Sequence, residues 1–197
     1  MPKLLYQGHG SFRLTTNGGT VVFIDPFVGT GYDTPADIVL VTHQHDDHRK
    51  LDLITQKPGC TVITNFEALE DGKHNSFLLQ DVGIEAVEAG NNEHHSLDQC
   101  VGYILTVDGV QLYFSGDTSK TAQMESFAAR KLDYAFFCGD GFYNMGLEEA
   151  AECAKLVGAK HNVPVHLKPG ELFDRERAEQ FTAPNRLIIE AGEEVDL

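Results

Sequence analysis

Short apolar runs separated by glycine, proline and polar turns dominate the first half of the chain. Their length and alternation predict β-strands rather than helices. The tripeptide Asn17-Gly18-Gly19 predicts a hairpin turn. Leu51–Gln56 is predicted to be helical and to end at Pro58-Gly59, and a short helix is expected at 65–69. The predicted strands are 3–7, 11–16, 20–24, 38–42 and 61–64.

The second half alternates apolar runs with helical patterns. Leu147–Val157 carries one apolar stripe and is the clearest helix, with others expected at 120–131 and 173–181. The acidic segment 190–196 is expected to be a solvated end. Hairpins followed by alternating strands and helices predict one layered α/β (α+β) domain over residues 1–197. The predicted strands are 84–89, 101–107, 110–114, 134–138, 163–165 and 187–189.

Composition and charge argue against several classes of function. The net charge of −15 argues against nonspecific nucleic-acid binding, which needs a basic surface. No apolar run reaches the roughly 18 residues that a membrane span needs. The segment Met1–Tyr6 shows no export signal, and the four cysteines have wide, irregular spacing. We therefore expect a cytoplasmic protein with reduced thiols and no membrane partner.

Candidate chemistry lies where predicted strands end. The run Val39–Thr42 leads into three histidines and two aspartates within positions 43–48. Buried histidine and aspartate side chains need partners, and imidazole and carboxylate are metal ligands. Such a dense ligand set predicts either two metal ions or one ion with many supporting groups. Four further polar residues follow other strands or loops: Asp25, His95, Asp117 and His166.

The stretch Thr42-His43-Gln44-His45-Asp46-Asp47-His48 resembles the T-H-x-H-x-D-H motif of metallo-β-lactamase-fold hydrolases. The other polar segments follow in the order typical of that family, so the resemblance spans residues 4–166. It implies a four-layer αββα sandwich. Within the family the chain resembles the short members near ascorbate-6-phosphate lactonase. Neither the helical domain of glyoxalase II nor the arm of the tRNA-processing endonuclease is expected in 197 residues.

The resemblance also implies a site with two divalent metal ions. His43, His45 and His95 would hold one ion, and Asp47, His48 and His166 the other. Asp117 would bridge the ions, and Asp25 would brace the 43–48 loop by hydrogen bonds. Redox members of the family place glutamate at the position of His45, so zinc is expected, with manganese or iron as alternatives.

The implied activity is hydrolysis of a small ester, lactone or phosphodiester by a hydroxide held between the two metal ions. Asp47 and Asp117 are the expected catalytic carboxylates, with Asp47 placed to orient the nucleophile or accept its proton. Alternatives are a nucleic-acid phosphodiesterase and a non-catalytic metal-binding protein. The short loops also suggest that a second protomer of a homo-oligomer completes the cleft.

The sequence leaves the roles of four residues undecided. His94 competes with His95 as the third-motif ligand, and the following Ser96 favours His95. His9, between two glycines, is a candidate for substrate contact or for support of the ligands. Tyr143 and Asn144, in the glycine-rich segment 139–146, are candidates for the mouth of the site.

Overall fold

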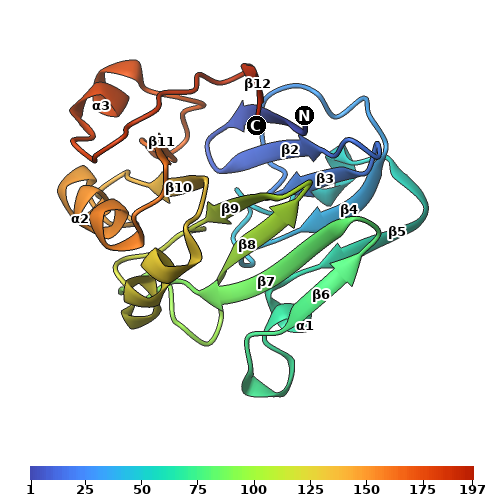
Figure 1. Ribbon diagram of the computed structural model, residues 1–197, viewed down its shortest axis with the longest axis horizontal. Coiled ribbons are helices and arrows are strands. Elements are labelled where there is room, and N and C mark those ends of the chain that lie inside the picture. The colour runs from blue at the N-terminus through green and yellow to red at the C-terminus, as the bar shows by residue number, and fades with distance from the viewer.

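Two six-stranded sheets pack face to face in the computed structural model, which describes residues 1–197 (Figure 1). The first sheet has the order β12 (Glu194–Asp196), β1 (Lys3–Gly8), β2 (Ser11–Thr15), β3 (Val21–Ile24), β4 (Ala36–Leu40) and β5 (Gln56–Ile63). The second has the order β11 (His161–Val165), β10 (Tyr134–Cys138), β9 (Val110–Phe114), β8 (Val101–Val107), β7 (Val82–Glu88) and β6 (Ser76–Leu79).

Each sheet is antiparallel in one part and parallel in another. Strands β1 to β3 are antiparallel and joined by short turns, as are β6–β7 and β8–β9, in agreement with the Asn-Gly-Gly and Asp-Gly sequences. Strands β7 and β8 are also antiparallel, but the longer loop 89–100 joins them. The pairs β3–β4, β4–β5, β9–β10 and β10–β11 are parallel. Parallel neighbours need crossover segments, and these bring several strand ends to one edge of the sandwich.

The main core lies between the sheets, where 23 buried side chains meet. Three phenylalanines from both sheets form its centre: the ring centroid of Phe12 lies 5.0 Å from those of Phe114 and Phe136, which stack at 4.8 Å. Their edge-to-face and stacked geometry fixes the relative position of the sheets. The polar segments at the strand ends come from both sheets, so this packing also sets the geometry of the site that they form.

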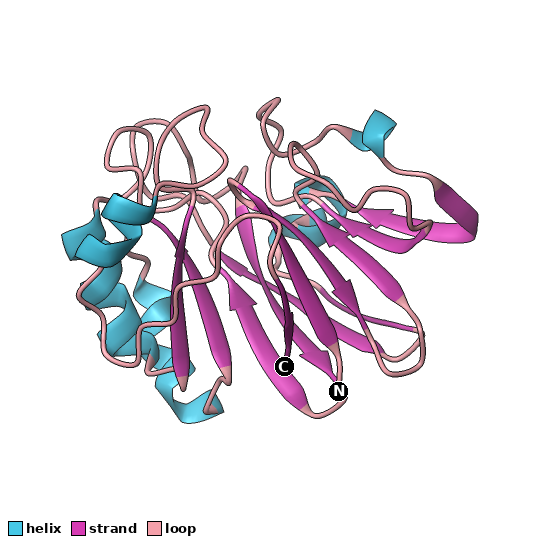
Figure 2. Cartoon of the chain, turned by 90° about the horizontal axis from the view of Figure 1, so that it is seen from above, coloured by secondary structure: helices cyan, strands magenta, loops and turns pink.

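Helices cover the outer faces (Figure 2). On the second sheet, α2 (Leu147–Val157) and the 3-10 segment η3 (Ala122–Arg130) bury a further cluster of 18 side chains. On the first sheet the cover is thinner: η1 (Leu51–Leu53) and the 27–35 loop bury a cluster of five. The predicted αββα class is therefore confirmed, with one outer layer much reduced. The remaining helical segments are α1 (Asn65–Ala68), η2 (Glu70–Gly72) and α3 (Arg175–Gln180).

The predicted helix at 51–56 is wrong. Only a single 3-10 turn forms, and β5 begins at Gln56 and runs through Pro58-Gly59. Strand β5 lies at the edge of the sheet, where proline is tolerated, and its register with β4 shifts between Ala36 and Ile38. At this irregularity β5 has more residues than β4, and these extra residues accommodate the Pro-Gly pair.

The C-terminal predictions also need correction. No strand forms at 187–189; a single bridge joins Asn162 to Arg186 instead. The acidic end is solvated, as expected, since its acidic side chains are exposed, but it also contributes the unpredicted strand β12, which pairs antiparallel with β1. Strand β6 was not predicted, because its exposed, half-buried pattern follows a turn. All four cysteines are free, and no helix combines the length and apolar character needed to cross a bilayer.

Candidate metal centre

One edge of the sandwich collects the polar segments that the sequence singled out. Loops gather there, at the opposite end of the strands from the chain termini (Figure 2). Strand β1 delivers His9, β3 delivers Asp25, and the loop after β4 carries residues 43–48. Strands β9 and β11 deliver Asp117 and His166 from the second sheet. Segments far apart in the sequence thus meet between the two sheets.

The first predicted ligand group is assembled. Nitrogen atoms of His43, His45 and His95 lie within 4.8 Å of one another. The Nδ1 atom of His45 is 3.2 Å from the Nε2 atom of His95. His43 and His95 are buried, whereas His45 is exposed. This group therefore opens to solvent on the side of His45.

The second group is also assembled, and it contains one residue more than predicted. Asp47, His48 and His166 lie together with His9, their ligand atoms again within 4.8 Å of one another. The Nε2 atom of His9 lies 3.2 Å from Asp47 Oδ2, and its Nδ1 atom lies 3.3 Å from the carbonyl oxygen of Glu171. His9 is buried and lines no open cleft, so its contacts fit support of Asp47 better than substrate contact.

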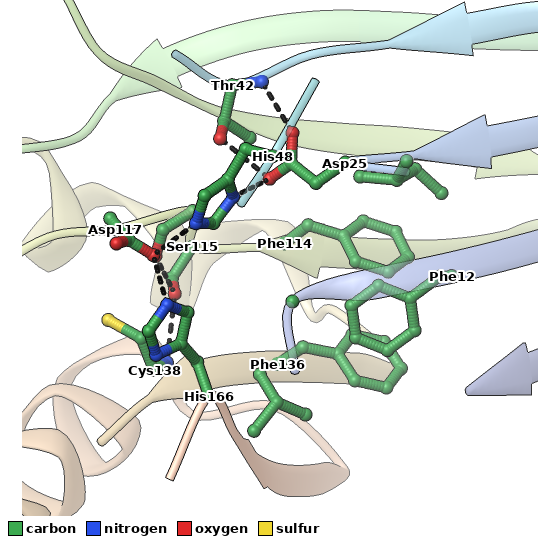
Figure 3. A pocket seen from close by; sticks show the side chains of 14 residues that line it. Phe12, Asp25, Thr42, His48, Phe114, Ser115, Asp117, Phe136, Cys138 and His166 are labelled. Atoms are coloured by element: carbon green, nitrogen blue, oxygen red, sulfur yellow. Dashed lines mark hydrogen bonds and ion pairs between the residues drawn. The ribbon is translucent and has the colours of Figure 1, made fainter. Parts of the chain in front are cut away.

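Asp117 lies between the two groups. Its Oδ2 atom faces the first, 3.4 Å from His95 Nε2 and 4.0 Å from His43 Nε2. Its Oδ1 atom faces the second, 3.3 Å from His48 Nε2 and 3.5 Å from His166 Nε2 (Figure 3). One carboxylate thus presents one oxygen to each group, the arrangement that a bridging ligand needs.

Asp25 braces the histidine loop, as the sequence predicts. Its Oδ1 atom accepts the backbone N–H of Thr42 at 2.7 Å. Its Oδ2 atom accepts the Thr42 hydroxyl at 2.7 Å and contacts His48 Nδ1 at 2.9 Å (Figure 3). A carboxylate can only accept hydrogen bonds, so Nδ1 of His48 carries a proton. The other ring nitrogen of His48, Nε2, then faces Asp117 and the centre.

The same hydrogen-bond network determines which ring nitrogen of His43 carries a proton. The Thr42 hydroxyl gives its hydrogen to Asp25, so it can only accept from His43 Nδ1, which lies 3.0 Å away. The Nε2 atom of His43 is then an unprotonated acceptor that points into the centre. Fixing the outer ring nitrogen so that the inner one is free is the usual way in which proteins prepare histidine ligands.

The centre fits divalent metal ions by an independent criterion. The Nε2 atoms of His43, His48 and His166 are buried and lie 3.3 to 4.0 Å from Asp117, but none of them forms a hydrogen bond of normal geometry. Unpaired buried polar atoms are costly and are rare in folded proteins. Three of them pointing into one space, with a carboxylate between them, form an imidazole and carboxylate donor set that suits zinc, iron and manganese.

The electrostatics of the centre point the same way. Burial, together with the nearby His48 ring, lowers the pKa of His43 to about 2. Burial opposes charge on His48, yet the carboxylates of Asp117 and Asp25 outweigh it and hold the pKa of His48 well above its ordinary value. Burial also raises the pKa of Asp117, but the facing His166 and His48 rings outweigh it and leave that pKa well below its usual range. The centre therefore favours positive charge beside an ionised carboxylate.

Sequence reasoning missed Asp140. Its Oδ2 atom lies 3.2 Å from His166 Nδ1, so it supports His166 as Asp25 supports His48. Its Oδ1 atom accepts the backbone N–H groups of Phe142, Tyr143 and Asn144. Asp140 lies two residues after the end of β10, so the rule that selected Asp25, a carboxylate where a buried strand ends, applied to it as well.

The geometry favours His95 over His94. The imidazole of His95 is buried and faces Asp117, while His94 is exposed at the rim, its ring centroid 5.1 Å from that of Tyr143. Asn92 holds both residues, because its Oδ1 atom accepts the backbone N–H of each. Tyr143 lines the open cleft beside the ligands, as expected. Asn144 does not: it is buried and donates to Asp140 Oδ2 at 2.9 Å.

Comparisons with known proteins agree with this fold and site. A family model described as a β-lactamase superfamily domain matches residues 3–166. A UPF0173 metal-dependent hydrolase of Nitratidesulfovibrio vulgaris is 31% identical over 83% of this chain and 79% of its own. Another, from Pyrococcus furiosus, is 26% identical and is covered over 100% of both chains.

Solved structures give the same result. A candidate metal-dependent hydrolase from Parabacteroides distasonis is 27% identical, with a TM-score of 0.78 over 96% of this chain and 92% of its own. The metallo hydrolase Igni18 of Ignicoccus hospitalis, 22% identical, shares the fold with a TM-score of 0.74 over 98% of this chain and 97% of its own. The chain therefore belongs to the β-lactamase superfamily, and its relatives identify it as a metal-dependent hydrolase of that superfamily.

Proposed function

We propose that this protein hydrolyses a small ester, lactone or phosphodiester at a centre of two divalent metal ions, with zinc as the expected metal. The position of Asp117 carries the proposal, since each of its oxygens faces a different histidine group. His43, His45 and His95 would hold one ion, and Asp47, His48 and His166 the other. When bound, such a pair of ions lowers the pKa of water towards ~7 and polarises the electrophilic oxygen of the substrate.

The chain's own groups would divide the remaining tasks. Asp25 and Asp140 keep His48 and His166 in one orientation, so that the ligand atoms need not reorganise during the reaction. Burial raises the pKa of Asp47, but the contacts with His9 and His48 outweigh it and leave the pKa well below normal. Asp47 is therefore an ionised carboxylate at neutral pH and, being half-buried beside the open cleft, is placed to orient the attacking water by accepting a hydrogen bond from it.

The test is hydrolysis of p-nitrophenyl acetate, bis(p-nitrophenyl) phosphate, a γ-lactone and single-stranded RNA by protein loaded with Zn²⁺ or Mn²⁺. We expect activity on at least one small substrate, loss of activity with chelator and recovery on metal addition. Asp117→Ala should lose both metal and activity. The matched control is Asp46→Ala, because Asp46 lies in the same loop but is exposed and pairs with Arg49. An Asp117→Ala variant with full metal content and full activity would refute the proposal.

A further inference from the structure

Large apolar side chains are exposed around the mouth of the metal centre. Phe66 and Phe142 are 66% and 69% exposed, values that burial of apolar area normally prevents in a folded chain. Of the exposed large apolar residues, Leu97, Phe142, Tyr143 and Leu172 lie on loops, and Phe66 lies in the short helix α1. Met1 at the N-terminus and Leu78 on β6 are exceptions.

Two adjoining clefts connect this rim to the centre. The first, with about 750 Å³ of open space, is lined by Tyr143 and by the candidate ligands themselves. The second, with about 680 Å³, is lined by Phe66 together with uncharged polar groups. His45, His94 and His95 line both clefts, so the second cleft is an extension of the first. Spaces of this size accommodate small-molecule ligands.

The position of Phe66 is fixed relative to the ligands. It lies in α1, whose first turn is held by the Thr64 capping box. The residue before it, Asn65, accepts a hydrogen bond from Gln44 Nε2 at 2.7 Å, and Gln44 lies between His43 and His45. An exposed aromatic ring is therefore tied through one hydrogen bond to the metal-binding loop. Its fixed place beside the centre suits contact with part of a substrate.

Neither cleft is lined by lysine or arginine. The nearby cations are already paired: Arg49 with Asp46 at 2.8 Å, and Lys168 with Glu171 at 2.5 Å. A substrate with an anionic group beyond the reacting bond would find no cationic lysine or arginine side chain in these clefts, and the net charge of −15 would repel it.

We propose that the substrate carries an uncharged aliphatic or aromatic group, and that this group packs against Phe66 while the reacting bond lies at the metal centre. This assignment rests on the proposed hydrolytic function and adds its substrate class. This substrate class excludes anionic substrates such as RNA and sugar phosphates. Phe66 is then a specificity-determining residue that contributes to binding and not to the chemical step.

The experiment compares kcat/KM for p-nitrophenyl butyrate and p-nitrophenyl hemisuccinate, which differ chiefly in a terminal methyl group against a carboxylate. The butyrate should be preferred at least tenfold. Phe66→Ala should lower kcat/KM for butyrate about tenfold, with metal content unchanged, and should alter that for p-nitrophenyl acetate less than about twofold, since a short acyl group does not reach Phe66. Phe66→Lys should raise kcat/KM for the hemisuccinate. Leu78→Ala, an equally apolar and exposed position away from the centre, should change none of these values.

The outcomes separate this inference from the proposed function. Equal or better hydrolysis of the hemisuccinate, or an equal effect of Phe66→Ala on all three esters, overturns the substrate class and leaves the hydrolase intact. If no ester is hydrolysed, the proposed ester chemistry fails. The substrate class is then tested by the binding of two thiols to the Co²⁺-loaded protein. Butanethiol should produce the thiolate–cobalt absorption band at lower concentration than 3-mercaptopropionate, and the reverse order overturns the assigned substrate class.

Discussion

Replacing Asp25 with asparagine tests how the histidine ligands are prepared. Asp25 has a left-handed backbone, φ 45°, which asparagine also tolerates, so the loop should keep its path. In the variant the side-chain oxygen can still accept the Thr42 N–H, but the NH₂ group then faces the Thr42 hydroxyl and His48 Nδ1. To accept from that NH₂ group, His48 must move its proton to Nε2. The proton would then occupy the position where a metal ion binds.

The expected effect follows from that change of tautomer. Loss of a partner that orients a histidine ligand typically weakens metal binding 10- to 100-fold, about 1.4–2.7 kcal/mol. We expect this loss at the ion held by His48, with a smaller effect at the ion held by His43. The loss of affinity at each of the two ions is measured by competition with a chromogenic chelator, together with metal analysis after gel filtration. The fold itself is checked by thermal melting of the metal-free protein.

The matched control is Ser11→Ala. Ser11 is as buried as Asp25 and donates to its backbone oxygen at 2.6 Å, but it does not contact the carboxylate. Its loss should cost about 1 kcal/mol of stability and leave metal affinity unchanged. The reasoning is refuted if Asp25→Asn binds both ions as tightly as the original protein, or if Ser11→Ala weakens binding equally.

Three further outcomes are expected. Asp140→Asn should weaken metal binding about 10- to 100-fold through His166, as metal analysis would show. Gly29→Ala should unfold the protein or lower its melting temperature sharply, because the added Cβ would lie 1.9 Å from the backbone oxygen of Gln7 at a φ of +86°. At Asp37, burial raises the pKa, but hydrogen bonds outweigh it and lower the net value. Asp37→Asn should therefore destabilise the protein above about pH 4, and the difference from the original protein should vanish as the pH falls below that value in denaturant titrations.

Most of the sequence signal for the candidate site is local. His43, His45, Asp47 and His48 lie within one loop, and Asp117 lies three residues after the end of an apolar strand. Asp140 was missed because a single aspartate between two glycines is also typical of an ordinary turn. Only the distance to His166 shows its task.

The errors in the fold come from non-local pairing. Strand β12 forms because β1, about 190 positions earlier, offers it an edge. Nothing in an acidic terminal segment indicates such a partner. The Pro-Gly pair in β5 is a turn signal by local rules, and the edge position and shifted register override it. Tertiary context decides both cases, whereas helix 147–157 was predicted with its observed bounds because its apolar stripe is continuous.

The most direct test of the central claim is an anomalous-scattering map of crystals grown with Zn²⁺ or Mn²⁺, recorded on both sides of the metal absorption edge. We predict two peaks about 3.5–4 Å apart, one beside His43, His45 and His95 and the other beside His48 and His166, with Asp117 between them. A single fully occupied peak, or no peak at the site where Asp117 meets the histidines, would contradict the account.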